Sequence, residues 1–138
     1  MKEYVLDANA VLRYFGANGG QGTNKVRAHF EQAERGQARL SMSVVNLGEV
    51  FYVLLKHVGE PRARHYVQVL QHVATMVEAD AGQALGAAKM KQMYKLGYAD
   101  SFAATLAVSL KATLVSADPA FEKLGKTLKW VRLEKFAK

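Results

Sequence analysis

The sequence predicts an α/β domain whose mainly parallel sheet is covered by helices on both faces. Short apolar runs typical of buried strands alternate along the whole chain with longer segments of helical spacing. This alternation is typical of parallel sheets, because a parallel strand pair needs a crossover connection that is usually a helix. At 138 residues the chain has the size of one domain, and no repeat, low-complexity tract or long linker divides it.

The first part of the chain predicts a strand, two helices and a loop between them. The apolar residues 4–6 indicate a short buried strand. Four glycines from Gly16 to Gly22 indicate a loop, and Gly36 ends the helical stretch that follows it. The resulting order is a strand over residues 3–7, a helix over 9–15, a loop over 16–22 and a helix over 25–35.

Characteristic end residues delimit the elements of the remaining chain. Ser43 is a favourable N-cap for a long apolar helix, Gly59 stops that helix, and Pro61 suits the first turn of the next one. Asp80 can cap a helix that Gly97 ends. The predicted elements are a strand over residues 39–42, helices over 44–57 and 61–74, a strand over 75–79, helices over 81–96 and 99–111, a strand over 112–116, a short helix over 119–124 and a strand over 128–132.

Composition excludes several classes of protein. The chain has no cysteine, which rules out disulfides, zinc ribbons and thiol nucleophiles. Glu3 and Asp7 interrupt the segment that a signal peptide would need to be apolar, and no apolar run approaches the ~20 residues of a membrane-spanning helix. We therefore expect a soluble, cytoplasmic protein. Its net charge of +7 favours an anionic partner such as nucleic acid.

Four of the twelve acidic residues stand where such a sheet would bind a ligand. Asp7 stands at the carboxyl end of the first strand and Asp118 follows the fourth. Right-handed crossovers bring the carboxyl ends of parallel strands to one edge, about 4.8 Å apart for neighbours. Asn9, two residues after Asp7, adds a neutral oxygen. Glu49 lies inside the apolar helix SVVNLGEVFYVLL, and Asp100 begins the helix ADSFAATLA.

The surroundings of these acids predict a cation. Apolar neighbours one turn from Glu49 predict a buried carboxylate, which is costly without a cation, a donor or water. Alanines beside Asp100 let its helix approach the sheet closely. Clustered carboxylates repel one another unless a cation or a proton neutralises them. Oxygen-only ligands suit Mg²⁺ or Mn²⁺ better than zinc, so we expect one or two such ions.

Each acid also has an ordinary structural explanation. Asp118 before Pro119 is a favourable N-cap, Asp7 can cap the helix that follows it, and the helix dipole favours Asp100 in a first turn. Glu49 can be a solvent-facing helix residue. No single acid therefore decides the function.

Other catalytic patterns are weaker. The segment GANGGQGT lacks the lysine and hydroxyl residue of a phosphate-binding P-loop, and the chain lacks the GxSxG elbow of a Ser-His-Asp hydrolase. The four histidines lie in separate helical stretches without the spacing of zinc ligands. Asp7 as a phosphoryl acceptor lacks the flanking residues of haloacid-dehalogenase-like phosphatases and response regulators.

Four segments of the sequence together resemble a known family. In this order and at these separations, YVLDANAVL, NLGEVFYVLL, GYADSFAATLA and LVSADPAFEKLG resemble the PIN domain and, within it, the VapC toxins of toxin–antitoxin pairs. The resemblance implies one PIN-like nuclease domain over residues 1–138, folded as an α/β/α sandwich. SAD stands where many members have TGD or TTD. The implied catalytic and metal-site acids are Asp7, Glu49, Asp100 and Asp118, with Asn9 and Ser116 in supporting positions.

The same resemblance implies an activity and partners. The family's usual activity is Mg²⁺- or Mn²⁺-dependent endoribonuclease cleavage, commonly of tRNA or ribosomal RNA, held in check by a cognate antitoxin, and a homodimer is expected. We expect a metal-activated water to hydrolyse an RNA phosphodiester. Apart from the four site acids, the chain has nineteen basic and eight acidic residues, a net +11, which suits RNA phosphates. Arg13 and Lys56 are the candidate RNA contacts.

Two other functions remain open. A PIN-like nuclease can act in RNA processing outside any toxin system, and a basic surface suffices for an RNA-binding module that keeps the fold without catalysis. The sequence shows no run of stacking aromatic residues that would indicate base-specific RNA recognition. It therefore does not name the RNA.

Overall fold

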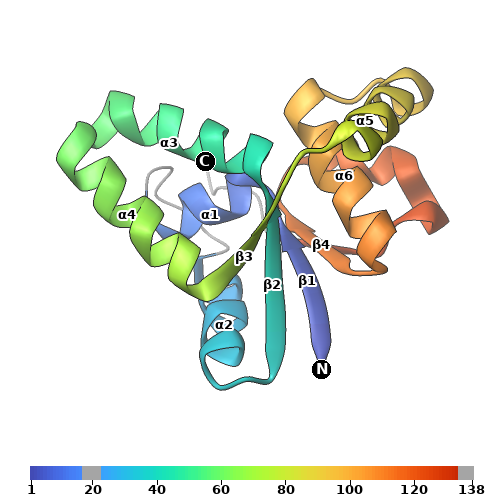
Figure 1. Ribbon diagram of the computed structural model, residues 1–138. Coiled ribbons are helices and arrows are strands. Elements are labelled where there is room, and N and C mark those ends of the chain that lie inside the picture. The colour runs from blue at the N-terminus through green and yellow to red at the C-terminus, as the bar shows by residue number, and fades with distance from the viewer. Residues whose placement is uncertain (17–22, 134–138) are drawn as a thin grey trace.

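The computed structural model describes residues 1–16 and 23–133, which form an α/β/α fold and confirm the predicted class. Five parallel strands make one sheet in the order β3-β2-β1-β4-β5. Figure 1 shows α3 and α4 on one side of the sheet and α5 and α6 on the other. The elements are β1 (Lys2–Leu6), α1 (Ala8–Tyr14), α2 (Thr23–Glu34), β2 (Ala38–Ser43), α3 (Val44–Val58), α4 (Glu60–Val73), β3 (Ala74–Val77), α5 (Ala81–Tyr94), α6 (Tyr98–Leu110), β4 (Thr113–Ser116), the 3₁₀ helix η1 (Pro119–Thr127) and β5 (Trp130–Arg132).

The central strands supply a core on each face of the sheet. Successive residues of a strand point to opposite faces, so Val5 and Leu114 pack with α6 and η1, whereas Leu6 and Val115 pack with α1, α3 and α4. All four side chains are fully buried. Burial on both faces explains why these strands read as continuous apolar runs in the sequence.

The strand order reverses at β1, and this reversal positions the site. β1 pairs with β2 on one side and with β4 on the other, with Leu6 in register with Val115. In open α/β sheets, ligands bind in the crevice beyond the carboxyl ends of the strands at such a reversal. The residues that follow β1 and β4 therefore meet at the position where open α/β sheets generally bind their ligands.

Helix α6 packs closely against the sheet, as its small residues predict. Ala103, Ala104 and Ala107 are fully buried, and α6 contacts β1, β2, β4 and α3. A larger side chain on this face would hold the helix away from the strands. The close approach brings the N-terminal turn of α6, which contains Asp100, to the carboxyl edge of the sheet.

Several element ends differ from the sequence prediction. Helix α5 ends at Tyr94 and not at residue 96, because Lys95 takes a left-handed φ of 54° and Leu96 turns into the core. The short helix after Asp118 is a 3₁₀ helix that runs on to Thr127 across a kink at Gly125, so β5 begins only at Trp130. Most of the predicted loop at residues 16–22 lies outside the described residues.

No helix within residues 1–16 and 23–133 is long and apolar enough to cross a membrane.

Candidate metal centre

Asp7 and Ser116 meet at the carboxyl ends of β1 and β4. Asp7 is the N-cap of α1, where its Oδ1 accepts a hydrogen bond of 2.8 Å from the Ala10 backbone amide. Its other carboxylate oxygen, Oδ2, accepts a hydrogen bond from the Ser116 hydroxyl. Both residues are buried. Asp7 thus caps α1 with one carboxylate oxygen and contacts the end of β4 with the other.

The Ser116 hydroxyl also holds the acid that follows β4. Its Oγ accepts a 3.0 Å hydrogen bond from the backbone amide of Asp118, so one hydroxyl connects Asp7 with the turn that bears Asp118. Asp118 in turn caps η1 by accepting a 2.9 Å hydrogen bond from the Ala120 amide, with Pro119 in the first turn. The backbone conformation around both acids is therefore fixed by hydrogen bonds.

Asn9 ties the first turn of α1 to the end of β4. Its Oδ1 accepts hydrogen bonds from Arg13 Nε, at 3.1 Å, and from the Ala117 amide, at 3.3 Å. These two donors occupy both lone pairs of the amide oxygen, so the Asn9 Oδ1 has no free lone pair for a cation. Arg13 is only 4% exposed, which suits it to hold Asn9 and leaves little surface for an RNA phosphate.

Helices α3 and α6 bring the other two acids toward the same edge. Asp100 lies in the first turn of α6, whose N-cap is Gly97. Asn46 of α3 is fully buried and its Nδ2 donates a 3.1 Å hydrogen bond to the carbonyl of Ala99. Since Glu49 is one helical turn after Asn46, this bond joins the helix that carries Glu49 to the residue before Asp100.

Glu49 is more exposed than the sequence predicts. Its apolar neighbours indicate burial, but in the structure Glu49 is exposed, beside Tyr52, which is 62% exposed. This face of α3 is therefore only half covered. Lys56 follows two turns after Glu49, is exposed, and places its Nζ 5.5 Å from the centre of the Tyr52 ring. Lys56 thus remains available for a contact with a ligand.

The electrostatics show that the four carboxyl groups act on one another. Burial, together with the charges of Asp100 and Glu49, raises the pKa of Asp7 to about 7, against the lowering effect of the hydrogen bonds from Ser116 and Ala10. Burial, then the charge of Asp118 and a hydrogen bond between the two carboxyl groups, raise the pKa of Asp100 to about 7. Partial burial also raises the pKa of Glu49, although Asn46 lowers it.

The four carboxylates are ligands of the kind that a hard divalent cation prefers, but their side chains are not arranged as a complete coordination site. In the part of the chain that the structure describes, no group of three or more His, Asp or Glu side chains has the geometry of a formed metal site. The charge of Asp118 beside Asp100 raises the pKa of Asp100, which favours a proton on the Asp100 carboxyl group. A cation can replace that proton and relieve the repulsion, and oxygen-only ligands suit Mg²⁺ or Mn²⁺.

Asn46 is the site residue that the sequence reading missed. The sequence does indicate it, because Asn46 is a polar residue in the apolar run SVVNLGEVFYVLL and lies one helical turn before Glu49. A polar side chain that faces the core needs a partner, and such a residue next to a candidate ligand indicates a link to a second element. Only the tertiary structure identifies that partner as Ala99.

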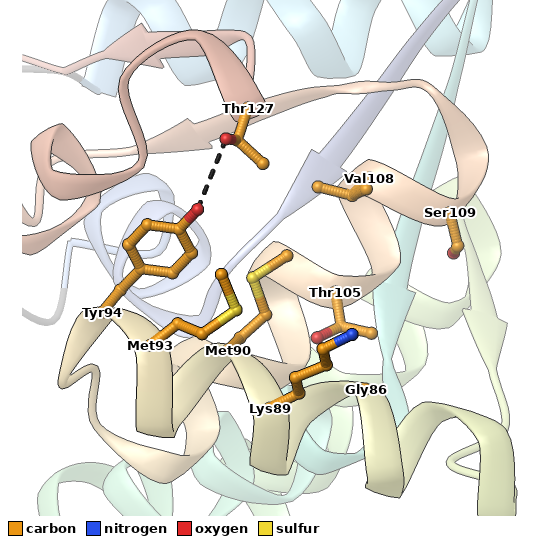
Figure 2. A pocket seen from close by; sticks show the side chains of 9 residues that line it. All are labelled: Gly86, Lys89, Met90, Met93, Tyr94, Thr105, Val108, Ser109 and Thr127. Carbon is orange, nitrogen blue, oxygen red and sulfur yellow. Dashed lines mark hydrogen bonds between the residues drawn. The ribbon is translucent and has the colours of Figure 1, made fainter.

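An apolar cavity lies apart from these acids. It has a volume of about 320 Å³ between α5 and α6 and includes Met90, Thr105 and Thr127 in its lining. Figure 2 shows Met90 and Met93 entering it from α5, with the hydroxyls of Tyr94 and Thr127 joined across it at 3.4 Å. None of the four candidate acids lines it, so it is not part of this centre.

Comparison with known proteins identifies the family and the fold. The family model described as PIN domain matches residues 4–127. No curated protein sequence matches this chain. Among solved structures, VapBC2 from Rickettsia felis, bound to a DNA fragment from its promoter, has a TM-score of 0.74 at 15% identity, covering 96% of this chain and 99% of that chain.

Two further structures are similar over most of their length. DNA-bound VapBC from Salmonella typhimurium has a TM-score of 0.73 at 16% identity, covering 96% of this chain and 98% of that chain. VapC20 from Mycobacterium tuberculosis, described as a sarcin-ricin loop cleaving toxin, has a TM-score of 0.71 at 13% identity, covering 88% of this chain and 95% of that chain. At such identities the likeness establishes the shared fold.

Proposed function

The chain belongs to the PIN domain family, and from this membership we propose that it is a divalent-metal-dependent endoribonuclease. One observation carries the proposal: a single hydroxyl, that of Ser116, connects Asp7 with Asp118, while Asp100 and Glu49 lie close enough for their charges to raise the pKa of Asp7. PIN domains are nucleases, and this arrangement supplies the acidic centre that such a reaction needs.

The residues have distinct roles in the proposed reaction. Asp7, Asp100 and Asp118 would hold Mg²⁺ or Mn²⁺, as one or two ions, with Glu49 at the open side of the centre. When bound, the cation lowers the pKa of a water molecule and neutralises charge on the scissile phosphate. Ser116 keeps Asp7 oriented by its hydrogen bond, Asn9 holds the end of β4, and Glu49, exposed and with a raised pKa, can accept the proton of the attacking water.

Several features support RNA as the substrate. The charge of +11 outside the four acids favours a polyanion, and Lys56 is exposed on the same helix as Glu49. Arg13 was a second candidate RNA contact, but its burial favours the support of Asn9 instead. A structured RNA such as a tRNA or a ribosomal RNA loop agrees with the described activity of the VapC20 structure, whose fold this chain shares.

The same comparisons support a toxin of the VapBC type. Three of the similar structures are toxin–antitoxin complexes from Rickettsia felis, Haemophilus influenzae and Salmonella typhimurium. We propose that this chain likewise has a cognate antitoxin, forms a homodimer and acts in the cytoplasm. A nuclease of RNA processing outside a toxin system is the alternative, and a non-catalytic RNA-binding module is the second one.

Cleavage by pure protein tests the enzyme proposal. The wild type is incubated with a folded tRNA and ribosomal RNA in Mg²⁺, in Mn²⁺ and in EDTA, beside Asp100→Asn and the control Asp80→Asn. Asp80 is an exposed helix cap outside the centre, and asparagine caps helices equally well. Metal-dependent cleavage by the wild type and by Asp80→Asn, but not by Asp100→Asn, supports the proposal.

The other outcomes are equally informative. Equal cleavage by Asp100→Asn would assign the activity to a contaminant and overturn the site. Binding of RNA without any cleavage would favour the non-catalytic module. A toxin role further requires that expression of the wild type, and not of Asp100→Asn, arrests growth, and that co-expression of an antitoxin relieves the arrest.

A further inference from the structure

A cavity at the sheet edge opposite the acids is surrounded by lysines. Its volume is about 320 Å³, and three of its eight lining residues are Lys111, Lys126 and Lys129. All three are exposed and none forms an ion pair with a described residue. No Asp or Glu of the described chain lines this cavity or the adjoining one, which contributes Lys89 and shares Val108 and Thr127.

The backbone fixes these lysines in place. Lys111 ends α6 in a left-handed conformation with φ 54°, and its amide donates a 3.2 Å hydrogen bond to the Val108 carbonyl. The carbonyl of Lys129 accepts a 2.9 Å hydrogen bond from Leu114 as β5 joins β4. Lys126 follows the kink at Gly125. The three lysines therefore reach the cavity from the end of a helix, from a 3₁₀ helix and from the residue before a strand.

Basic and acidic residues are unevenly distributed in the C-terminal part of the chain. Residues 81–133 contain eight Lys and Arg but only three acids. Two of these acids, Asp100 and Asp118, belong to the candidate centre, and the third, Glu122, pairs with Arg132 at 2.8 Å. Asp100 and Lys111 lie near opposite ends of α6, roughly 16 Å apart at 1.5 Å per residue. Lys111, Lys126 and Lys129, called the lysine groove below, thus have no pairing acid within residues 81–133.

We propose that this lysine groove binds the RNA backbone at phosphates distant from the one that is cut. The inference rests on the proposed ribonuclease function and assigns a second contact surface for that substrate. Phosphates close to the four acids are repelled until a cation binds, so affinity has to come from elsewhere on the protein. Lysines contact phosphates as point charges without reading bases, and a structured RNA that contacts both surfaces gains affinity by linkage.

Binding measured without cleavage tests the groove. The affinity of metal-free protein in EDTA for a folded tRNA is measured at several salt concentrations for the wild type and for the triple variant Lys111→Gln, Lys126→Gln, Lys129→Gln. The control Arg27→Gln, Arg35→Gln, Arg62→Gln removes the same charge at exposed positions outside the groove. Each lysine–phosphate contact contributes ~0.7–0.9 to the magnitude of the slope of log K against log salt concentration. We therefore expect that magnitude to decrease by about 2 in the groove variant and to stay unchanged in the control.

The affinity itself should fall on the order of tenfold or more at 0.1 M salt. The triple Lys→Arg variant keeps the charge and should bind like the wild type, which separates lost charge from lost folding. With Mg²⁺ present, the groove variant should raise KM for tRNA with kcat unchanged. If the groove variant and the control have equal slopes and affinities, the groove proposal is overturned while cleavage by the wild type still upholds the proposed function.

Two further results would also overturn the proposal. A wild type that neither cuts nor binds RNA refutes the proposed function, and the groove inference fails with it. If the groove variant binds RNA like the wild type but no longer binds polyglutamate, the groove is a binding site for an acidic protein segment and not for RNA.

Discussion

The side-chain amide of Asn46 in α3 donates a hydrogen bond of 3.1 Å to the backbone carbonyl of Ala99, the residue before Asp100. It connects the helix that bears Glu49 to the first turn of α6 and is fully buried. The distance between two of the four candidate acids therefore depends on a residue that carries no charge.

Replacement of Asn46 should affect both stability and the proposed site. Asn46→Ala leaves the Ala99 carbonyl without its donor, and such a loss costs about 1–3 kcal/mol of unfolding free energy. We also expect weaker Mn²⁺ binding, measured by electron paramagnetic resonance, because Glu49 and Asp100 lose their link. The control Gln92→Ala alters an exposed amide of α5 and should leave both quantities unchanged. Unaltered Mn²⁺ affinity in Asn46→Ala would limit Asn46 to a role in stability.

Ser116 should determine how Asp7 presents its carboxylate. Ser116→Ala removes the donor to Asp7 and the acceptor for the Asp118 amide, and loss of a group that orients a metal ligand typically weakens metal binding 10- to 100-fold. Titration calorimetry with Mn²⁺ measures this effect. The control Ser109→Ala removes an exposed hydroxyl that forms hydrogen bonds with Leu106 of α6 and Gln83 of α5. The Mn²⁺ affinity of this variant should equal that of the wild type. Equal affinities for both variants would contradict the role of Ser116.

Stability should fall with rising pH when no metal is present. The pKa values of Asp7 and Asp100 are raised from 3.8 to about 7 in the folded chain, so the folded state holds protons that the unfolded state releases. The resulting stabilisation is complete below about pH 4 and is lost as the pH rises to about 7. Urea unfolding in EDTA between pH 5 and pH 8 measures the loss.

Magnesium should reverse this loss, because a cation competes with the protons for the same carboxylates. Addition of Mg²⁺ should raise the melting temperature more at pH 8 than at pH 5.5. In Asp100→Asn, both the pH dependence and the effect of Mg²⁺ should be smaller. A metal-free protein that becomes more stable from pH 5 to pH 8 would contradict the raised pKa values.

Two glycines of the helices should respond to alanine in opposite directions. A Cβ at Gly86 of α5 would lie 2.8 Å from Cγ2 of Thr105 in α6, whereas a Cβ at Gly48 of α3 meets nothing within 4 Å. Gly86→Ala should lower the free energy of unfolding by about 1–3 kcal/mol through overpacking. Gly48→Ala should raise it by roughly 0.5–1 kcal/mol through helix propensity. Thermal and urea unfolding measure both, and stabilisation by Gly86→Ala would show that α5 and α6 can separate at little cost.

The sequence by itself determined the order and type of the elements and which acids are candidates. Continuous apolar runs such as residues 4–6 are buried on both faces of a parallel sheet, and that burial pattern is a local property of the chain. The alanines after Asp100 likewise predict the close packing of α6. Strand order and register then bring Asp7 and Ser116 together, since neighbouring carboxyl ends share one edge of the sheet.

The tertiary structure alone decided the partners and the exposure of side chains. It places Glu49 at the surface in spite of its apolar neighbours. It also shows that Arg13 donates a hydrogen bond to Asn9 and that Asn46 donates one to the Ala99 carbonyl. It also brings Lys111, Lys126 and Lys129 around one cavity. Each of these depends on which elements pack together over long sequence separations, and helical or strand periodicity contains no information about a contact between two distant elements.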